Sequence, residues 1–112
     1  MSVWNLTDLI VDTRRSGANF KDFLRVESMS CGMYILPGGG VDNQTPHRED
    51  EIYVIVRGSG QILIDDTSHP VEPGSVIFVP ANVEHRFHSY EEDLEILVVF
   101  APAYSGRASA GA

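Results

Sequence analysis

Residues 45–58 read TPHREDEIYVIVRG, a charged segment that runs directly into an apolar run and stops at a glycine. The apolar residues 52–56 are all β-branched or aromatic, which predicts a β-strand. His47 and Glu51 lie four positions apart, so on an extended chain both side chains project to the same face. An imidazole and a carboxylate on one face are ligands for a divalent metal. The alternative is a surface ion pair at the start of the strand, in a segment crowded with other charges.

The rest of the chain divides into short segments rich in Val, Ile, Tyr or Phe and bounded by turn residues. We expect strands at 20–27, 30–36, 51–57, 60–65, 76–79, 84–89 and 94–100, with a short extended piece at 69–72. Many short strands at regular spacing predict an all-β antiparallel sandwich or barrel. One helix over 5–16, with Asn5 as its cap, is expected before the first strand.

The length and charge of the chain restrict its organisation and its partners. At 112 residues it is long enough for one core, and we expect one domain over 1–104 and a flexible tail over 105–112. The net charge of −8 argues against nucleic acid and against an anionic membrane surface, because no basic patch is available. No signal peptide is visible at the N-terminus. Cys31 has no second cysteine to pair with, so we expect a reducing cytoplasm.

Three segments are apolar at every position, namely 52–56, 76–79 and 96–100. A strand with one face in water should alternate between apolar and polar residues. We therefore expect both faces of these strands to be buried, one inside the fold and one against another sheet or another subunit. In so small a protein this pattern predicts a homodimer.

A second histidine, His85, opens a strand after the segment 76–79, which ends at Pro80. Gly74 permits the tight turn that leads into that segment, and Asn82 is the best non-glycine residue where φ must be positive. If His85 meets His47 and Glu51, the three form the 2-His-1-carboxylate set that holds a divalent metal and leaves coordination positions open.

The two motifs together resemble the cupin superfamily. The first cupin motif, G-x5-H-x-H-x3-E-x6-G, is matched in register by Gly39, Thr45 in place of the first histidine, His47, Glu51 and Gly58. The second, G-x5-P-x-G-x2-H-x3-N, is matched by Gly74, Pro80, Asn82 in place of glycine, His85, and Ser89 in place of asparagine. The resemblance implies a double-stranded β-helix, the small jelly-roll barrel of single-domain cupins, preceded here by the short helix.

The resemblance also implies a metal site. Family members with the full motif offer three histidines and one glutamate, and this chain keeps His47, Glu51 and His85 at the matching positions. Gln44 lies next to Thr45, and its amide oxygen could act as a fourth ligand if the loop turns inward. Nitrogen and oxygen ligands suit Fe, Mn, Zn, Ni and Cu alike, so the ligand set does not select the metal.

Two functions are compatible with this reading. The first is a divalent-metal-dependent enzyme acting on a small molecule, an oxidoreductase of the dioxygenase kind or an isomerase or lyase. The second is a non-catalytic cupin module that binds a small ligand and keeps its metal as structure. Tyr53 and Phe87 share strand parity with Glu51 and His85, so they line either the cavity beside the metal or the apolar core.

Overall fold

The computed structural model describes residues 1–106, which form one helix followed by eight strands. The elements, in chain order, are α1 (Leu6–Ser16), β1 (Phe20–Val26), β2 (Met29–Leu36), β3 (Asp50–Arg57), β4 (Gly60–Ile64), β5 (Thr67–Val71), β6 (Val76–Val79), β7 (His85–His88) and β8 (Leu94–Ala101). Each predicted strand is present, with ends that differ by no more than about two residues. The predicted helix is present as α1.

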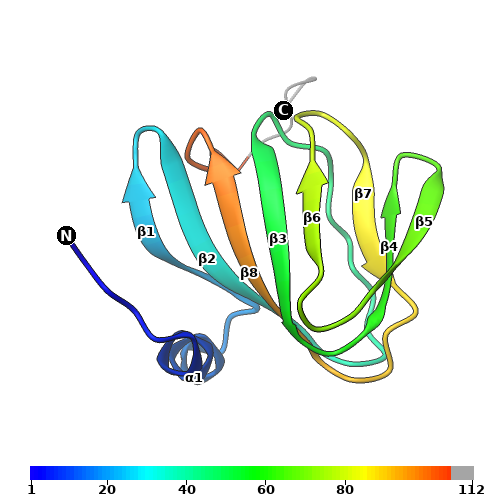
Figure 1. Ribbon diagram of the computed structural model, residues 1–112, viewed down its shortest axis with the longest axis horizontal. Helices are drawn as coiled ribbons and strands as arrows, with labels where there is room; N and C mark the ends of the chain where they lie inside the picture. Colours follow the sequence, from blue (N-terminus) through cyan, green and yellow to red (C-terminus); the bar gives the residue numbers. More distant parts are fainter. Residues whose placement is uncertain (107–112) are drawn as a thin grey trace.

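The strands form two antiparallel sheets, shown in Figure 1. The larger sheet has the order β1-β2-β8-β3-β6, and the smaller has the order β5-β4-β7. This confirms the all-β jelly roll with a short N-terminal helix. The sheets do not close into a continuous barrel, because within residues 1–106 β6 pairs only with β3, and β5 only with β4.

Helix α1 begins and ends where the sequence predicts. Asn5 Oδ1 accepts hydrogen bonds from the backbone N–H groups of Thr7, at 2.9 Å, and Asp8, at 3.3 Å. Gly17 follows the helix with φ 75°, and its N–H donates to Arg14 O. A left-handed residue at this position is the usual way to satisfy the last carbonyls of a helix.

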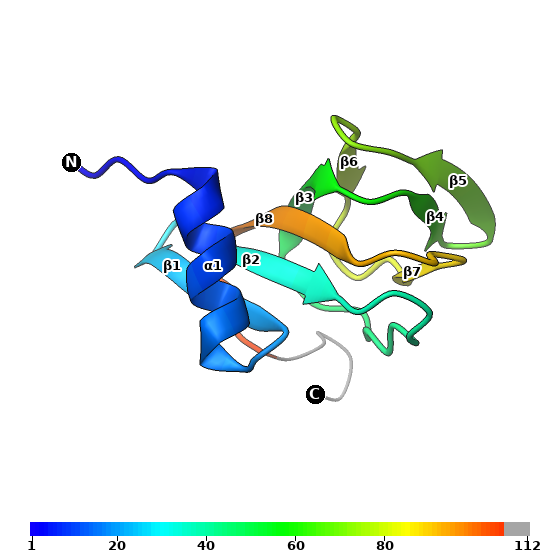
Figure 2. The same cartoon turned by 90° about the horizontal axis from the view of Figure 1, so that it is seen from below.

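The helix lies across the face of β1 and β2 that points away from the smaller sheet (Figure 2). Leu9 and Thr13 are its buried residues. Arg14 Nη2 reaches Glu95 Oε2 at 2.8 Å and Asp93 Oδ2 at 3.1 Å. Since the Glu95 side chain is only 2% exposed, this pair is screened less than an ordinary surface ion pair.

Two turns position β6 and β7, the strands on either side of the segment that leads to His85. Gly74 has φ 92° and its N–H donates to Ile55 O at 2.8 Å, which sets the turn before β6. Asn82 has φ 66°, as expected for its position, and its N–H donates to His47 O at 2.7 Å. The turn before β7 is therefore tied to the segment that precedes β3.

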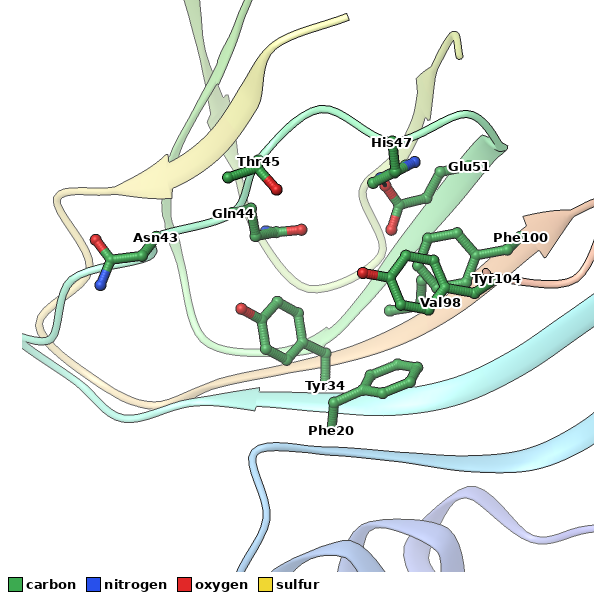
Figure 3. Close-up of a pocket in the computed structure, with 10 residues that line it drawn as sticks. All are labelled: Phe20, Tyr34, Asn43, Gln44, Thr45, His47, Glu51, Val98, Phe100 and Tyr104. Carbon is green, nitrogen blue, oxygen red and sulfur yellow. Dashed lines mark hydrogen bonds and ion pairs between the residues drawn. The ribbon is translucent and has the colours of Figure 1, made fainter. Parts of the chain in front are cut away.

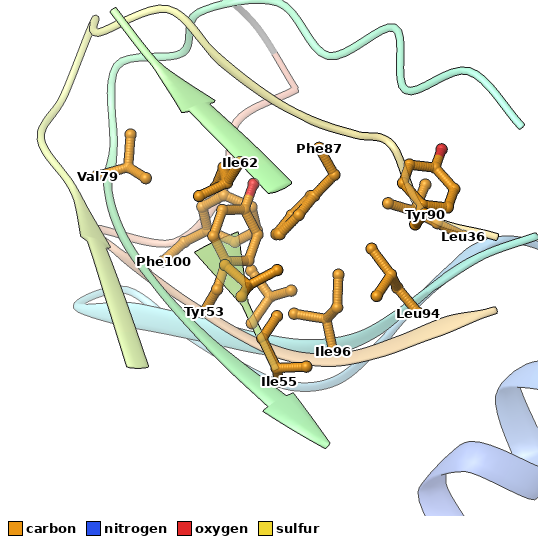
Figure 4. Close-up of a cluster of buried hydrophobic side chains, with 12 residues drawn as sticks. Leu36, Tyr53, Ile55, Ile62, Val79, Phe87, Tyr90, Leu94, Ile96 and Phe100 are labelled. Carbon is orange, nitrogen blue, oxygen red and sulfur yellow. The ribbon is translucent and has the colours of Figure 1, made fainter. Parts of the chain in front are cut away.

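The apolar core lies between the two sheets (Figure 4). Tyr53, Ile55 and Ile96 come from the larger sheet, and Ile62 and Phe87 come from the smaller. The rings of Tyr53 and Phe87 meet edge to face, with centroids 5.0 Å apart. These two residues belong to the core and not to the cavity beside the histidines, so the core alternative was the right one.

The structure tests the expected C-terminal tail and domain boundary only in part. The predicted flexible tail, 105–112, lies outside the described residues from 107 onward, and the division at residue 104 stays a prediction. Within residues 1–106, no helix combines the length and the apolar character needed to cross a lipid bilayer.

The apolar pattern of β3 and β6 leaves an uncovered apolar face on this chain. Phe78 pairs with Ile52, and Val76 pairs with Val54, on the outer side of the larger sheet. Phe78 is 57% exposed, Val76 is 67% exposed and Ile52 is 39% exposed. A single chain therefore buries only one face of these strands, and the homodimer that would bury the other stays a prediction.

We expect sedimentation velocity at micromolar concentration to show a dimer that Phe78→Glu converts to a monomer, because the substitution places a charge in the apolar face. Val11→Glu is the matched control, since Val11 is an exposed apolar residue on α1. Wild-type protein that sediments as a monomer would show the prediction to be wrong.

Candidate metal centre

The three predicted ligands meet between the two sheets. His47 precedes β3, Glu51 is the second residue of β3 in the larger sheet, and His85 is the first residue of β7 in the smaller sheet. Their candidate ligand atoms all lie within 4.8 Å of one another. His47 Nε2 is 2.9 Å from Glu51 Oε1, and His85 Nε2 is 3.1 Å from the same oxygen. All three residues are buried.

Backbone carbonyls determine the tautomer of both imidazoles. His47 Nδ1 donates to Glu49 O at 3.2 Å, and His85 Nδ1 donates to Val83 O at 2.9 Å. A carbonyl oxygen can only accept, so each Nδ1 must carry a proton. In a neutral imidazole the other nitrogen then presents a lone pair, which is the form that ligates a metal.

The lone pairs create an electrostatic conflict that either protons or a metal ion must remove. With both histidines neutral, two Nε2 lone pairs would face the Glu51 carboxylate at about 3 Å, an electrostatically unfavourable contact. His85 Nε2 finds no aligned hydrogen-bond partner among residues 1–106, although it is buried. Either protons on Nε2 or a metal ion between the three side chains removes this conflict. Two nitrogens and one carboxylate oxygen fit a divalent transition metal.

The same contacts shift the pKa values of Glu51 and His85. Burial favours the neutral form of Glu51, but hydrogen bonding and charge from His47 and His85 outweigh it and hold the pKa of Glu51 below its ordinary value. Burial disfavours the charged form of His85, and the Glu51 carboxylate and the Val83 carbonyl outweigh it and raise the pKa of His85. When no metal ion is bound, both pKa shifts favour a negatively charged Glu51 next to a positively charged His85.

Gln44, the predicted fourth ligand, lies on the wall of the same cavity. Its Oε1 accepts from the Tyr53 hydroxyl at 2.8 Å, and its Nε2 donates to Asp42 Oδ2 at 2.6 Å. The amide is thus held by two partners, and its role as a ligand stays a prediction. Thr45, at the position of the missing histidine, is exposed and also borders the cavity.

Asp42 is a buried residue that sequence reasoning missed. Its carboxylate accepts hydrogen bonds from the Tyr34 hydroxyl at 3.0 Å, Gln44 Nε2 at 2.6 Å and the Phe87 N–H at 2.8 Å. It thereby ties the loop before β3 to β2 and to β7. Burial and the nearby Asp42 charge raise the pKa of Tyr34, which keeps this hydroxyl a donor.

Glu49 is a second buried carboxylate, and the sequence does not indicate its burial. Its Oε2 accepts from the Ser105 N–H at 3.2 Å, and its Oε1 lies 3.7 Å from His47 Nδ1 without an aligned hydrogen-bond partner in the described residues. The Glu49 backbone and side chain therefore both approach the outer nitrogen of His47. Both carboxylates occur in loops, where no periodic pattern indicates which residues are buried.

A cavity of about 340 Å³ opens beside His47 and Glu51 (Figure 3). Its lining is Phe20, Tyr34, Asn43, Gln44, Thr45, His47, Glu51, Val98, Phe100 and Tyr104. The polar residues 43–45 come from the loop before β3, and the aromatic residues come from β1, β2, β8 and the segment after β8. The candidate ligands His47 and Glu51 thus lie beside a cavity with one polar wall and one aromatic wall.

Comparison with known proteins agrees with this architecture. A family model described as the cupin domain matches residues 32–100. An uncharacterised protein of Streptomyces coelicolor is 40% identical over 105 residues, which cover 94% of this chain and 100% of that protein.

Solved structures show the same fold. KdgF from Halomonas sp. matches with a TM-score of 0.70 and 18% identity, over 77% of this chain and 79% of that chain. The DMSP lyase DddQ from Ruegeria pomeroyi matches with a TM-score of 0.66 and 21% identity, over 74% of this chain and 47% of that chain. At these identities the likeness extends to the fold alone.

We expect Asp42→Ala to lower the free energy of unfolding by about 3 kcal/mol, because it leaves three donors without their acceptor. Urea denaturation measures this change. The control, Glu92→Ala, removes an exposed loop carboxylate and should shift stability by less than about 0.5 kcal/mol. Equal effects of the two substitutions would contradict the role of Asp42.

Proposed function

Because the chain belongs to the cupin family, we propose that it is a divalent-metal-dependent enzyme for a small-molecule substrate, with the ion bound by His47, Glu51 and His85. The observation that carries the proposal is the pair of Nδ1 hydrogen bonds to backbone carbonyls, which direct both Nε2 atoms toward one Glu51 oxygen. Such second-sphere hydrogen bonds are the usual support of metal-binding histidines.

The number of protein ligands favours a catalytic role of the ion over a purely structural one. Structural zinc sites are closed by four protein ligands, whereas a three-ligand site leaves positions for substrate or water. The cavity lies beside His47 and Glu51, so a small molecule in it would reach the open side of the ion. A bound ion would supply Lewis-acid or oxygen-activating chemistry. This supports an oxidoreductase of the dioxygenase kind or an isomerase or lyase.

The surrounding residues would orient the substrate and exclude water. Burial, and then the Glu51 charge, raise the pKa of Tyr53 well above its ordinary value, so its hydroxyl acts as a donor and not as a base. That hydroxyl holds Gln44 at the cavity wall. The aromatic side chains Phe100 and Tyr104 shield the side of the site next to His47.

The second candidate is a ligand-binding module in which the ion is structural. It is favoured by Thr45, which leaves the ligand set one histidine short of the full cupin motif, and by the position of the three candidate ligands between the two sheets. In either case we propose a cytoplasmic protein with a small-molecule ligand and no nucleic-acid or membrane partner, in keeping with the net charge of −8.

Metal analysis of natively purified protein tests the site. We expect about one divalent ion per chain in the wild type, and a loss of affinity of more than about 100-fold in His85→Ala, because even second-sphere changes cost about 10- to 100-fold. His69→Ala is the matched control, since His69 is exposed on β5 and remote from the site. Equal metal content in the His85→Ala variant would rule out the proposed ligand set.

The stability of the metal-free protein separates the two candidates. If the ion is catalytic, chelator treatment should lower the melting temperature by only a few degrees, because the core between the sheets is complete without it. A loss of cooperative unfolding in the chelated wild type, matched by His85→Ala, would instead identify a structural ion.

A further inference from the structure

We propose that the cavity beside the metal centre takes an uncharged aromatic or similarly flat ring compound that carries adjacent oxygen donors. The inference rests on the proposed metal-dependent function and specifies its substrate class. Three features of the described residues carry it: a continuous aromatic wall, the lack of cationic side chains in the lining, and the position of the ligands at one end of the cavity.

The aromatic wall is continuous and leads to a metal ligand. Phe20 meets Tyr34 and Phe100 edge to face, with centroids 6.1 and 6.2 Å apart. Phe100 stacks on Tyr104 at 4.6 Å, and both rings meet the His47 imidazole edge to face, at 5.3 and 5.8 Å. Aromatic rings pair with one another in offset or edge-to-face geometry, so a flat ring is the ligand shape that such a wall favours.

The backbone is built to accommodate this wall. A Cβ atom on Gly32 would lie 2.5 Å from the Phe20 ring, so the ring occupies the space that any other residue at position 32 would fill. Gly32 pairs with Val98 on β8, and Val98 also lines the cavity. The glycine thus lets the Phe20 side chain lie against β2 and contribute to the wall.

The lining favours an uncharged ligand body. None of its ten residues is lysine or arginine, and its only carboxylate is Glu51. Asp42 and Glu49 are buried directly behind Tyr34 and His47 and add negative charge. Among the described residues, the cavity lining therefore offers no lysine or arginine to a phosphate or carboxylate at the end of a ligand far from Glu51.

The geometry also restricts the reactive end of the ligand. Because the candidate ligands lie at one end of the cavity, a molecule against the aromatic wall would present one edge to the ion, where oxygen donors can complete the coordination. An apolar cavity of about 150 Å³ holds a benzene ring. The volume of about 340 Å³ therefore leaves room for a ring and a chelating group.

Tyr104 is the wall residue that can be removed with least disturbance. The segment that carries it is held by its backbone: Tyr104 N–H donates to Ser30 Oγ at 2.9 Å, Arg25 donates to Tyr104 O at 2.6 Å, and Ser105 N–H donates to Glu49 at 3.2 Å. None of these bonds uses the Tyr104 ring. Tyr104→Ala should therefore remove part of the wall and leave the segment and the metal ligands in place.

The test compares two probes that chelate metals through the same group. Acetohydroxamic acid and benzohydroxamic acid differ only in a methyl group against a phenyl ring. By titration calorimetry with the metal-loaded protein, we expect the phenyl compound to bind at least about tenfold more tightly, because its ring is buried against the aromatic wall.

Two variants test whether the aromatic wall causes the preference for the phenyl compound. In Tyr104→Ala we expect the ratio of the two affinities to fall to within about threefold, with most of the loss in the binding of benzohydroxamic acid. Trp4→Ala, which removes a half-exposed ring on the N-terminal segment, is the matched control and should keep the full ratio. A carboxylate at the far end of the phenyl ring should weaken binding by at least about fivefold.

The outcomes separate this proposal from the one on which it rests. A protein that binds metal but has equal affinity for the two probes, or prefers the carboxylated compound, would overturn the ring-binding proposal and leave the metal centre intact. A protein that cannot be loaded with metal would overturn both. Loss of acetohydroxamic acid binding in Tyr104→Ala would show that the residue supports the metal site and does not select the ligand, which also overturns the proposal.

Discussion

The convergence of two imidazoles on one carboxylate oxygen is the constraint around which this end of the molecule is organised. His47, Glu51 and His85 are all buried, and buried polar groups of this kind are costly unless each has a partner. The three residues belong to segments of both sheets, so satisfying them fixes how the sheets approach each other. The bond from Asn82 N–H to His47 O adds a backbone link at the same place.

The space between the sheets has two parts of different character. One part is filled by the apolar core, in which Tyr53 and Phe87 pack edge to face. The other holds three buried carboxylates, those of Asp42, Glu49 and Glu51, within a short distance of the cavity. Asp42 and Glu51 are matched by several donors or imidazoles, whereas one oxygen of Glu49 has none within residues 1–106. A cation held by His47, Glu51 and His85 would offset part of this negative charge.

The strands and the three candidate ligands could both be predicted from the sequence, because both depend on short-range pattern, whereas metal binding by these ligands stays a prediction. Runs of β-branched and aromatic residues between turn residues locate the strands, and fixed spacing indicates His47, Glu51 and His85. Strand parity also puts Tyr53 on the inner face, but parity does not tell how far along the sheet a side chain lies, so the core and the cavity could not be separated. Strand β5 was only partly predicted, because it is an edge strand with mostly exposed side chains and shows no alternation.

The carboxylates whose burial the sequence could not predict have partners far away along the chain. Asp42 bonds to Phe87 across 45 positions, and Glu49 bonds to Ser105 across 56. Such contacts form only when the loop before β3 and the segment after β8 have been brought together by the fold. The same holds for the aromatic wall, whose rings come from β1, β2, β8 and the segment after it.

The place of Tyr104 in the cavity wall has a practical consequence for handling this protein. Tyr104 borders the cavity, and the backbone N–H groups of Tyr104 and Ser105 donate to Ser30 and Glu49, so a fluorescent protein or affinity handle fused shortly after them would be attached close to the site. The first residues of the chain lie beyond α1, on the other side of the larger sheet (Figure 2). Fusions at the N-terminus are therefore the ones expected to leave ligand access undisturbed.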